Sequence, residues 1–294
     1  MSILVDGATR VLVQGITGSQ GRFDTGLALA YGTAIVAGVT PGKGGTEVFG
    51  IPVFDTVEEA VAVTGATAAV SYVPAARAAG AVEEAVAGGL RLVVATTENV
   101  PRHDAARAVA AARAAGTALV GFNTNGVISP GRAKLGGIGG DRPDRIFRPG
   151  RVGICSRSGG MAAEIAATLG EAGLGVSTCV AMGGDPITGL AMADYARLFQ
   201  EDRDTDAIVV FGEPGTRNEQ DLAAAIAAGE VTKPVVALLA GHFQEAYPAG
   251  ASFGHLAAAI RSPDDRVSRK AEVLRAAGAR VAGWLEDIPA LLAG

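Results

Sequence analysis

The first half of the chain alternates short apolar blocks with alanine-rich stretches of helical composition. Each block has the length of a buried parallel strand whose two faces are covered by helices. Strands that alternate with helices predict a parallel sheet. We expect strands over residues 10–14, 34–39, 68–73, 91–96 and 118–121, with helices over 57–64, 75–87 and 104–115.

The same alternation restarts after residues 126–149, a stretch rich in glycine, proline and charged residues that shows no apolar period. Such a stretch predicts a linker at a domain boundary. We therefore expect a first domain over 1–125, a linker over 126–149 and a second domain over 150–294. Both domains are predicted to be doubly wound α/β domains, with ligands at the carboxyl ends of the strands. The second domain is expected to have strands over 151–155, 176–181, 207–211, 235–239 and 280–283, and helices over 161–172, 191–200, 218–228 and 266–277.

A glycine-rich turn follows the first predicted strand. Gly15, Gly18 and Gly21 are spaced three apart and run into a helical stretch. Such a turn lets backbone N–H groups approach an anionic ligand at a helix N-terminus. The spacing is GxxGxxG rather than GxGxxG, and the second strand ends without the acid that would bind a ribose 2′-hydroxyl. Thr40 and Lys43 follow that strand instead, and a cation there suits a phosphorylated ribose, as in coenzyme A (CoA) or NADP.

Composition narrows the class of protein. The 294 residues are 49% hydrophobic with a mean hydropathy of +0.31, yet no apolar run approaches the ~18–20 residues that span a bilayer. A net charge of −5 without a basic run gives no nucleic-acid footprint. Cys155 and Cys179 have no metal-site spacing and are interpreted as buried thiols, so no metal site is expected. With no export signal at the start, we expect a cytoplasmic enzyme component that binds neither membrane nor nucleic acid.

Several motifs in the second half could carry chemistry. Residues 156–160 (Ser-Arg-Ser-Gly-Gly) form a small-residue turn between a strand and a helix, which suits either a second anion site or a plain glycine turn. Glu213 ends a predicted strand. Of the three histidines, His103 is expected at the surface and His242 is open to either role. A loop histidine such as His255 is, from its position alone, more often structural or exposed to solvent.

Taken together, these motifs resemble the α subunit of succinyl-CoA synthetase and the related NDP-forming acyl-CoA ligases. The resemblance covers essentially the whole chain. It implies an N-terminal Rossmann-like CoA-binding domain and a C-terminal flavodoxin-like ligase domain. The matching segments include 14–21, 38–45, 50–54, 64–67, 156–159, 183–187, 212–213, 231–236 and 254–255.

The resemblance also implies roles for individual residues. His255 occupies the position of a histidine that takes a phosphoryl group, and Glu213 that of the carboxylate that orients it. The acyl phosphate then formed would be attacked by the CoA thiolate, giving acyl-CoA, NDP and phosphate. The phosphate would lie on a turn made of Ser156, Ser158, Gly159 and Gly160. The implied CoA-binding residues are Thr17, Gly18, Ser19, Gln20, Thr40, Lys43, Val73, Pro74, Thr97, Glu98 and Asn123.

The nucleotide that starts this cycle is expected on another chain, because this one has no GxxxxGK[ST] loop. The resemblance implies an ATP-grasp β subunit that binds ATP or GTP with Mg²⁺. We therefore expect an αβ or α₂β₂ assembly that acts on a small carboxylate.

Three departures from the family pattern lie close to the chemistry. Ala163 stands where the family has a tyrosine near the substrate carboxylate, Thr124 replaces a cysteine, and Asp264 and Asp265 follow the His255 loop. Loss of a phenol enlarges a pocket and removes a donor, so the expected acid is other than, or broader than, succinate. The alternatives are true succinate specificity, a catalytically altered CoA-binding regulatory or scaffold protein, and an NAD(P)-dependent dehydrogenase.

Overall fold

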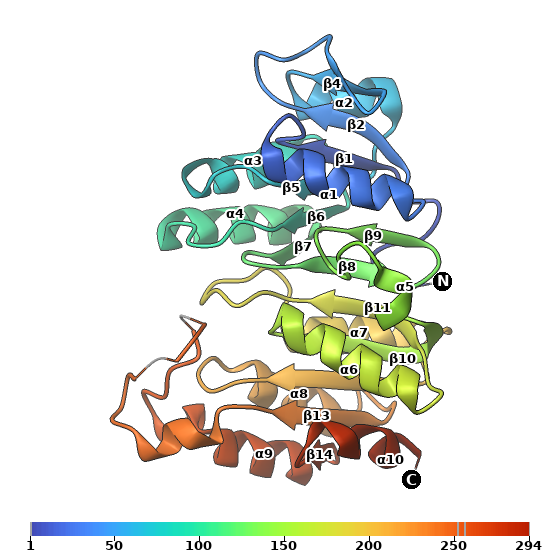
Figure 1. Cartoon of the computed structure of the whole chain (residues 1–294). Helices are drawn as coiled ribbons and strands as arrows, with labels where there is room; N and C mark the ends of the chain where they lie inside the picture. The colour runs from blue at the N-terminus through green and yellow to red at the C-terminus, as the bar shows by residue number, and fades with distance from the viewer. Residues whose placement is uncertain (1, 252, 256, 294) are drawn as a thin grey trace.

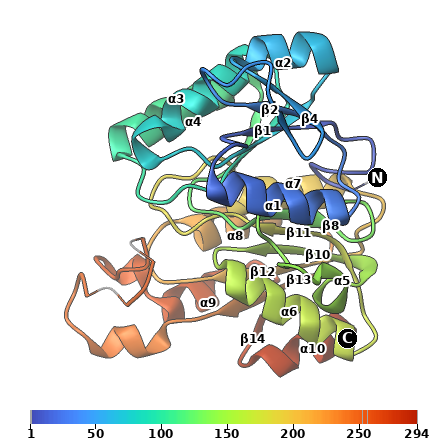
Figure 2. The same cartoon turned by 45° about the horizontal axis from the view of Figure 1, so that its top comes forward.

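The computed structural model describes residues 2–251, 253–255 and 257–293 as two α/β units stacked one on the other (Figures 1 and 2). The first unit is a sheet in the order β3-β4-β2-β1-β5-β6-β7. Every strand pair in it is parallel except β3 with β4. Its strands are β1 (Val11–Gln14), β2 (Ile35–Val39), β3 (Glu47–Val48), β4 (Ile51–Phe54), β5 (Ala68–Ser71), β6 (Leu92–Ala95) and β7 (Ala118–Gly121). Its helices are α1 (Ser19–Ala30), α2 (Val57–Thr64), α3 (Ala75–Ala87) and α4 (Arg102–Ala115).

The second unit is a sheet in the order β14-β13-β12-β10-β11-β8-β9, in which only the pairs that involve β8 are antiparallel. Its strands are β8 (Gly126–Ser129), β9 (Ala133–Leu135), β10 (Pro149–Ser156), β11 (Val176–Ala181), β12 (Ala207–Gly212), β13 (Val235–Leu239) and β14 (Arg280–Ala282). Its helices are α5 (Pro143–Ile146), α6 (Gly159–Glu171), α7 (Met192–Glu201), α8 (Asn218–Ala227), α9 (Val267–Ala276) and α10 (Ile288–Ala293). Short 3₁₀ turns are η1 (His242–Ala246), η2 (Pro263–Asp265) and η3 (Leu285–Asp287).

The two parallel-dominated α/β sheets confirm the predicted fold class, and the apolar blocks form their central strands. β1, β5, β6, β11, β12 and β13 are buried along their whole length because helices cover both faces. Local signals set helix ends as well. The Thr56 side chain accepts a hydrogen bond from Glu59 N at the start of α2, and Gly65 ends that helix with φ 63°.

The segment predicted as a linker, 126–149, is more ordered than its composition indicates. β8 and β9 lie within it, and β8 pairs antiparallel with β11 of the second sheet. Neither strand was expected from the sequence. These strands are only four and three residues long, too short for an alternating apolar period to show between the surrounding glycines.

The same strands connect the two units. One cluster of buried apolar side chains continues from β1 and β5 through Val127 and Leu135 into β11 and β12. On the α1 side, Thr33 Oγ1 both donates to Lys134 O and accepts from Lys134 N, each at 3.0 Å. In the described part of the chain, no helix is long and apolar enough to cross a membrane.

Candidate functional site

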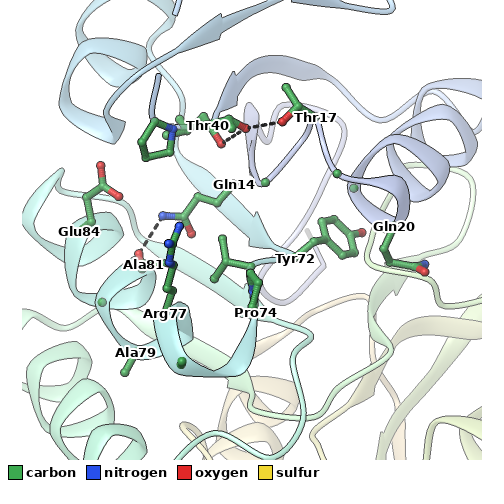
Figure 3. A pocket seen from close by; sticks show the side chains of 18 of the residues that line it. Gln14, Thr17, Gln20, Thr40, Tyr72, Pro74, Arg77, Ala79, Ala81 and Glu84 are labelled. Atoms are coloured by element: carbon green, nitrogen blue, oxygen red, sulfur yellow. Dashed lines mark hydrogen bonds between the residues drawn. The ribbon is translucent and has the colours of Figure 1, made fainter. Parts of the chain in front are cut away.

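The first candidate site is a cavity of about 670 Å³ at the carboxyl ends of β1, β2 and β5 (Figure 3). The glycine turn forms one wall. Gly15 has φ 80°, and a Cβ at Gly21 would stand 2.3 Å from the carbonyl oxygen of Gly15. Glycine is therefore required where the turn packs against the first turn of α1. Helix α1 begins at Ser19 with its N-terminus on the cavity, an arrangement that favours an anion.

Most of the residues expected to bind CoA lie in the wall of this cavity. Thr17 Oγ1 donates to Thr40 Oγ1 at 3.2 Å across its mouth, and Gln14 Nε2 donates to Ala81 O at 2.8 Å (Figure 3). These bonds tie the ends of β1 and β2 to each other and to helix α3. The expected residues in the lining are Thr17, Gly18, Ser19, Gln20, Thr40, Val73 and Pro74.

Four expected residues lie outside that lining. Lys43 and Glu98 are exposed. Thr97 does not line the cavity, but its Oγ1 donates to the carbonyl oxygen of Val73, a lining residue, at 2.6 Å. Asn123 bridges the two units, since its backbone N donates to Thr97 O and its Nδ2 donates to Asp185 Oδ1, both at 3.0 Å.

The structure adds a cation that sequence reasoning missed. Arg77, in the first turn of α3, lines the cavity and has no ion-pair partner among the residues that the structure describes. Arg107 lines it too, but bonds Glu83 at 2.5 Å and Asp104 at 2.9 Å. Arg77 is therefore the better placed of the two for a phosphate group. In the sequence, Arg77 is marked only by its place three residues after Pro74, a pattern that does not indicate a phosphate site.

The second candidate site lies at the carboxyl ends of β10 and β12. Ser158 caps helix α6, its hydroxyl accepting from Met161 N at 3.4 Å. Ser156 Oγ donates to Ser158 O at 2.6 Å and accepts from Ser158 N at 3.1 Å. Gly159 and Gly160 are the first residues of α6, so this predicted turn has the N–H groups of a helix start available. A Cβ at Gly159 would overlap the Asn125 side chain.

His255 and Glu213, which are far apart in the sequence, are in direct contact here. Nδ1 of His255 lies 2.8 Å and 3.0 Å from the two carboxylate oxygens of Glu213. Arg157 belongs to the turn before α6, and its Nε lies 3.6 Å from the same carboxylate. The Arg157 side chain is only 2% exposed and donates to Gly184 O at 3.2 Å. It thereby links the helix turn to the histidine pair.

The contact between His255 and Glu213 shifts the pKa of both side chains. The hydrogen bond that His255 Nδ1 donates to Glu213, together with the negative charge of Glu213, raises the pKa of His255 against burial and the positive charge of Arg157, and Asp185 adds to the rise. Burial alone would raise the pKa of Glu213. Its hydrogen bond and charge interaction with His255, and the charge of Arg157, outweigh that effect and lower the pKa. Glu213 is therefore a carboxylate near neutral pH, suited to stabilise a positive imidazole.

The His255 ring lies against Gly184, in the segment that follows β11. A Cβ at Gly184 would stand 2.5 Å from the imidazole ring, so glycine is required there. The acidic residues after His255 point elsewhere. The Asp265 carboxylate accepts from Arg261 N and Ser262 N at 2.9 and 2.7 Å, and the Asp264 side chain is 70% exposed. Leu256, which follows His255 in the sequence, lies outside the described residues.

The remaining expected residues are more distant from this pair. Ala163 lies on α6 and packs against the apolar cluster of the second sheet, outside the 270 Å³ cavity that His255 and Glu213 line. Cys155 and Cys179 are buried, as expected, and burial raises the pKa of both thiols. His103 is exposed, also as expected, and His242 is exposed at the start of η1.

Two family models match the chain. A CoA binding domain matches residues 6–99, and a succinyl-CoA ligase like flavodoxin domain matches residues 149–285. Among curated relatives, the succinate–CoA ligase [ADP-forming] subunit alpha 2 of Archaeoglobus fulgidus is 46% identical over 100% of this chain and 99% of its own. The malate–CoA ligase subunit alpha of Methylorubrum extorquens is 43% identical over 96% and 94% of the two chains.

A solved structure shares the whole fold. The ATP citrate lyase of Methanothrix soehngenii, in complex with citrate and coenzyme A, superposes with a TM-score of 0.91 at 25% identity. The match covers 99% of this chain, which spans half the length of that lyase chain.

Proposed function

Because the chain belongs to the α-subunit family of the succinate–CoA ligases, we propose that it is the α subunit of an NDP-forming carboxylate–CoA ligase that works through a phosphohistidine at His255. The contact of His255 Nδ1 with both carboxylate oxygens of Glu213 carries this proposal. Through this contact, a partly buried carboxylate is held on an imidazole, and both side chains line a cavity at the carboxyl end of β12.

The geometry indicates how the two residues divide the work. With Nδ1 held by Glu213, Nε2 is the nitrogen that we assign as the phosphoryl acceptor. As the P–N bond forms and the bond to NDP breaks, the ring becomes positive, and the ionised Glu213 stabilises that charge through the Nδ1 proton. The turn of Ser158, Gly159 and Gly160 offers N–H donors and the positive end of α6 to the phosphate.

The second half of the reaction returns the histidine to its starting state. An oxygen of the substrate carboxylate attacks phosphorus, the P–N bond breaks, and an acyl phosphate leaves a neutral imidazole. The CoA thiolate then attacks the acyl carbon and expels phosphate. This covalent route divides one difficult transfer into two easier ones. The sum is acid, CoA and NTP giving acyl-CoA, NDP and phosphate.

We place the nucleotide part of CoA in the cavity of the first unit. Thr17, Gly18, Ser19 and Gln20 would surround it at the start of α1, and Thr40 would contact it from β2. Arg77 supplies a cation for one of its phosphates, a role that the sequence favoured for Lys43. Thr97, Glu98 and Asn123 would then act at the outer part of the cleft, where the thiol end must reach the second unit.

The nucleotide and the partner belong to the same proposal. The relatives named above are α subunits, and we propose an ATP-grasp β subunit that binds ATP or GTP with Mg²⁺ in an αβ or α₂β₂ assembly. We further propose a substrate other than, or broader than, succinate, because Ala163 stands where the family has a tyrosine near the substrate carboxylate.

A reconstituted assay tests the proposal. The chain is mixed with its ATP-grasp partner, ATP or GTP, CoA and a panel of small carboxylates, and NDP and thioester are measured. Thioester formation that needs both chains and CoA supports the ligase. CoA binding by calorimetry without turnover on any acid would indicate the altered CoA-binding scaffold instead. Binding of a nicotinamide cofactor but not of CoA would indicate a dehydrogenase.

A further inference from the structure

Beneath the loop that carries Glu213 lies a buried pair of opposite charges, Glu219 and Lys270, that the reaction does not use. Neither side chain is exposed at all. Glu219 lies in the first turn of α8 and Lys270 in the middle of α9, and Nζ of Lys270 is 2.5 Å from Oε2 of Glu219.

All the polar side-chain atoms of this pair are hydrogen-bonded, either to each other or to the backbone of residues 213–215. Lys270 Nζ donates to Glu213 O at 2.7 Å and also to Gly215 O, so its three protons have three acceptors. The other oxygen of Glu219 accepts from Glu213 N at 3.2 Å. The pair therefore holds both the N–H and the C=O of the residue whose side chain reaches His255.

Stability alone is a weak reason for such a pair. Burying two charges is costly, and apolar replacements of a buried ion pair are often neutral or stabilising. Glycine at position 212 leaves space for the Glu219 carboxylate, since a Cβ there would stand 2.2 Å from Oε1 of Glu219. A pair that bonds the main chain on either side of a functional side chain restricts where that side chain points.

We propose that Glu219 and Lys270 are positioning residues that fix the backbone of residues 213–215 and so aim the Glu213 carboxylate at His255. The inference deepens the proposed function and rests on it for the catalytic consequence. Its structural part, the placement of Glu213, concerns this chain alone.

The double variant Glu219→Gln/Lys270→Met tests this. It removes both buried charges together, so neither is left unpaired, and it keeps an oxygen able to accept from Glu213 N. It deletes the three Lys270 donors. The matched control is Lys233→Met, because Lys233 also donates to two backbone carbonyls of the second unit, Phe199 O and Asp202 O, both at 2.6 Å.

Two measurements separate positioning from general stability. The pKa of His255 is followed by NMR titration of the isolated chain, in which Glu213, Arg157 and Asp185 are the charged groups that act on it. The rate of His255 phosphorylation is measured with the partner subunit and NTP. We expect the double variant to melt close to the control. Its His255 pKa should fall toward the ordinary value of about 6.5. Its phosphorylation should slow by on the order of tenfold or more, since a displacement of about 1 Å can cost about a hundredfold.

A folded double variant with the wild-type pKa and rate would overturn the proposal. If that variant does not fold, Gly212→Ala is used, since its Cβ displaces the Glu219 carboxylate while both charges remain. An unchanged His255 pKa in Gly212→Ala would likewise overturn it. A wild-type chain that is never phosphorylated would refute the phosphohistidine, while the pKa comparison would still decide whether the pair positions Glu213.

Discussion

Replacing Arg77 with methionine should weaken CoA binding more than any other single charge removal around the first cavity. The Arg77 side chain lines the cavity and has no ion-pair partner in the described part of the chain, so its guanidinium is available to a phosphate. Arg107 lines the same cavity but is already bonded to Glu83 and Asp104. Lys43 lies outside the lining.

The size of the effect follows from exposure. A hydrogen bond to a charged group contributes about 1.5–3 kcal/mol, and solvent screening at an exposed arginine reduces this to about 1–2 kcal/mol. Because about 1.4 kcal/mol changes an equilibrium tenfold, the Kd for CoA should rise by roughly 5- to 30-fold. Arg107→Met and Lys43→Met should each change the Kd by less than about threefold.

Isothermal titration of CoA into the three variants and the wild type, at two salt concentrations, measures this. The Kd of Arg77→Met should also depend less on salt, because one charge contact is gone. Wild-type affinity in Arg77→Met, with a clear loss in Lys43→Met, would refute the assignment and restore the expectation drawn from the sequence.

Other perturbations test separate parts of the structure. Because the pKa of His255 is raised in the fold, protonated His255 stabilises the fold fully below its unfolded pKa, and this contribution is lost as the pH rises through its folded pKa. Because the pKa of Glu213 is lowered, its contribution is fully present above its unfolded pKa and is lost as the pH falls through its folded pKa. His255→Asn should therefore lower the Tm most between about pH 4.5 and 6.5 and least near pH 9, by melting curves across that range. Gly21→Ala should destabilise the chain by about 1–3 kcal/mol in urea and weaken CoA binding, whereas Gly7→Ala, where a Cβ meets nothing within 4 Å, should do neither. Ala163→Tyr should shift relative rates toward succinate in the reconstituted assay, and unchanged ratios would count against the enlarged pocket.

The parallel strands and their helices could be predicted because burial on both faces leaves a plain signal. β1 and β12 are wholly apolar apart from their last residues, and each ends at a turn that the sequence marks with glycine. The short antiparallel strands gave no such signal. β4 contains Pro52, which argues against a strand, and its hairpin with β3 turns through Phe49 and Gly50, both at positive φ.

For the candidate sites too, locally marked residues could be predicted from the sequence, whereas contacts between distant segments could not. Glycine turns and strand ends are local features, so Gly15 and Ser158 could be placed in advance. The contact of His255 with Glu213 was expected only through the family resemblance, since the two are 42 residues apart. Glu219 and Lys270 could not be found at all, because each looks like an ordinary charge on a helix until tertiary packing buries both.

Phosphoryl labelling tests the central claim most directly. The chain is incubated with its ATP-grasp partner and ATP or GTP labelled in the γ-phosphoryl group, and wild type is compared with His255→Asn. The account predicts an acid-labile, base-stable label on this chain that is absent from His255→Asn. A label that persists in His255→Asn, or no label on wild type with an active partner, would contradict it.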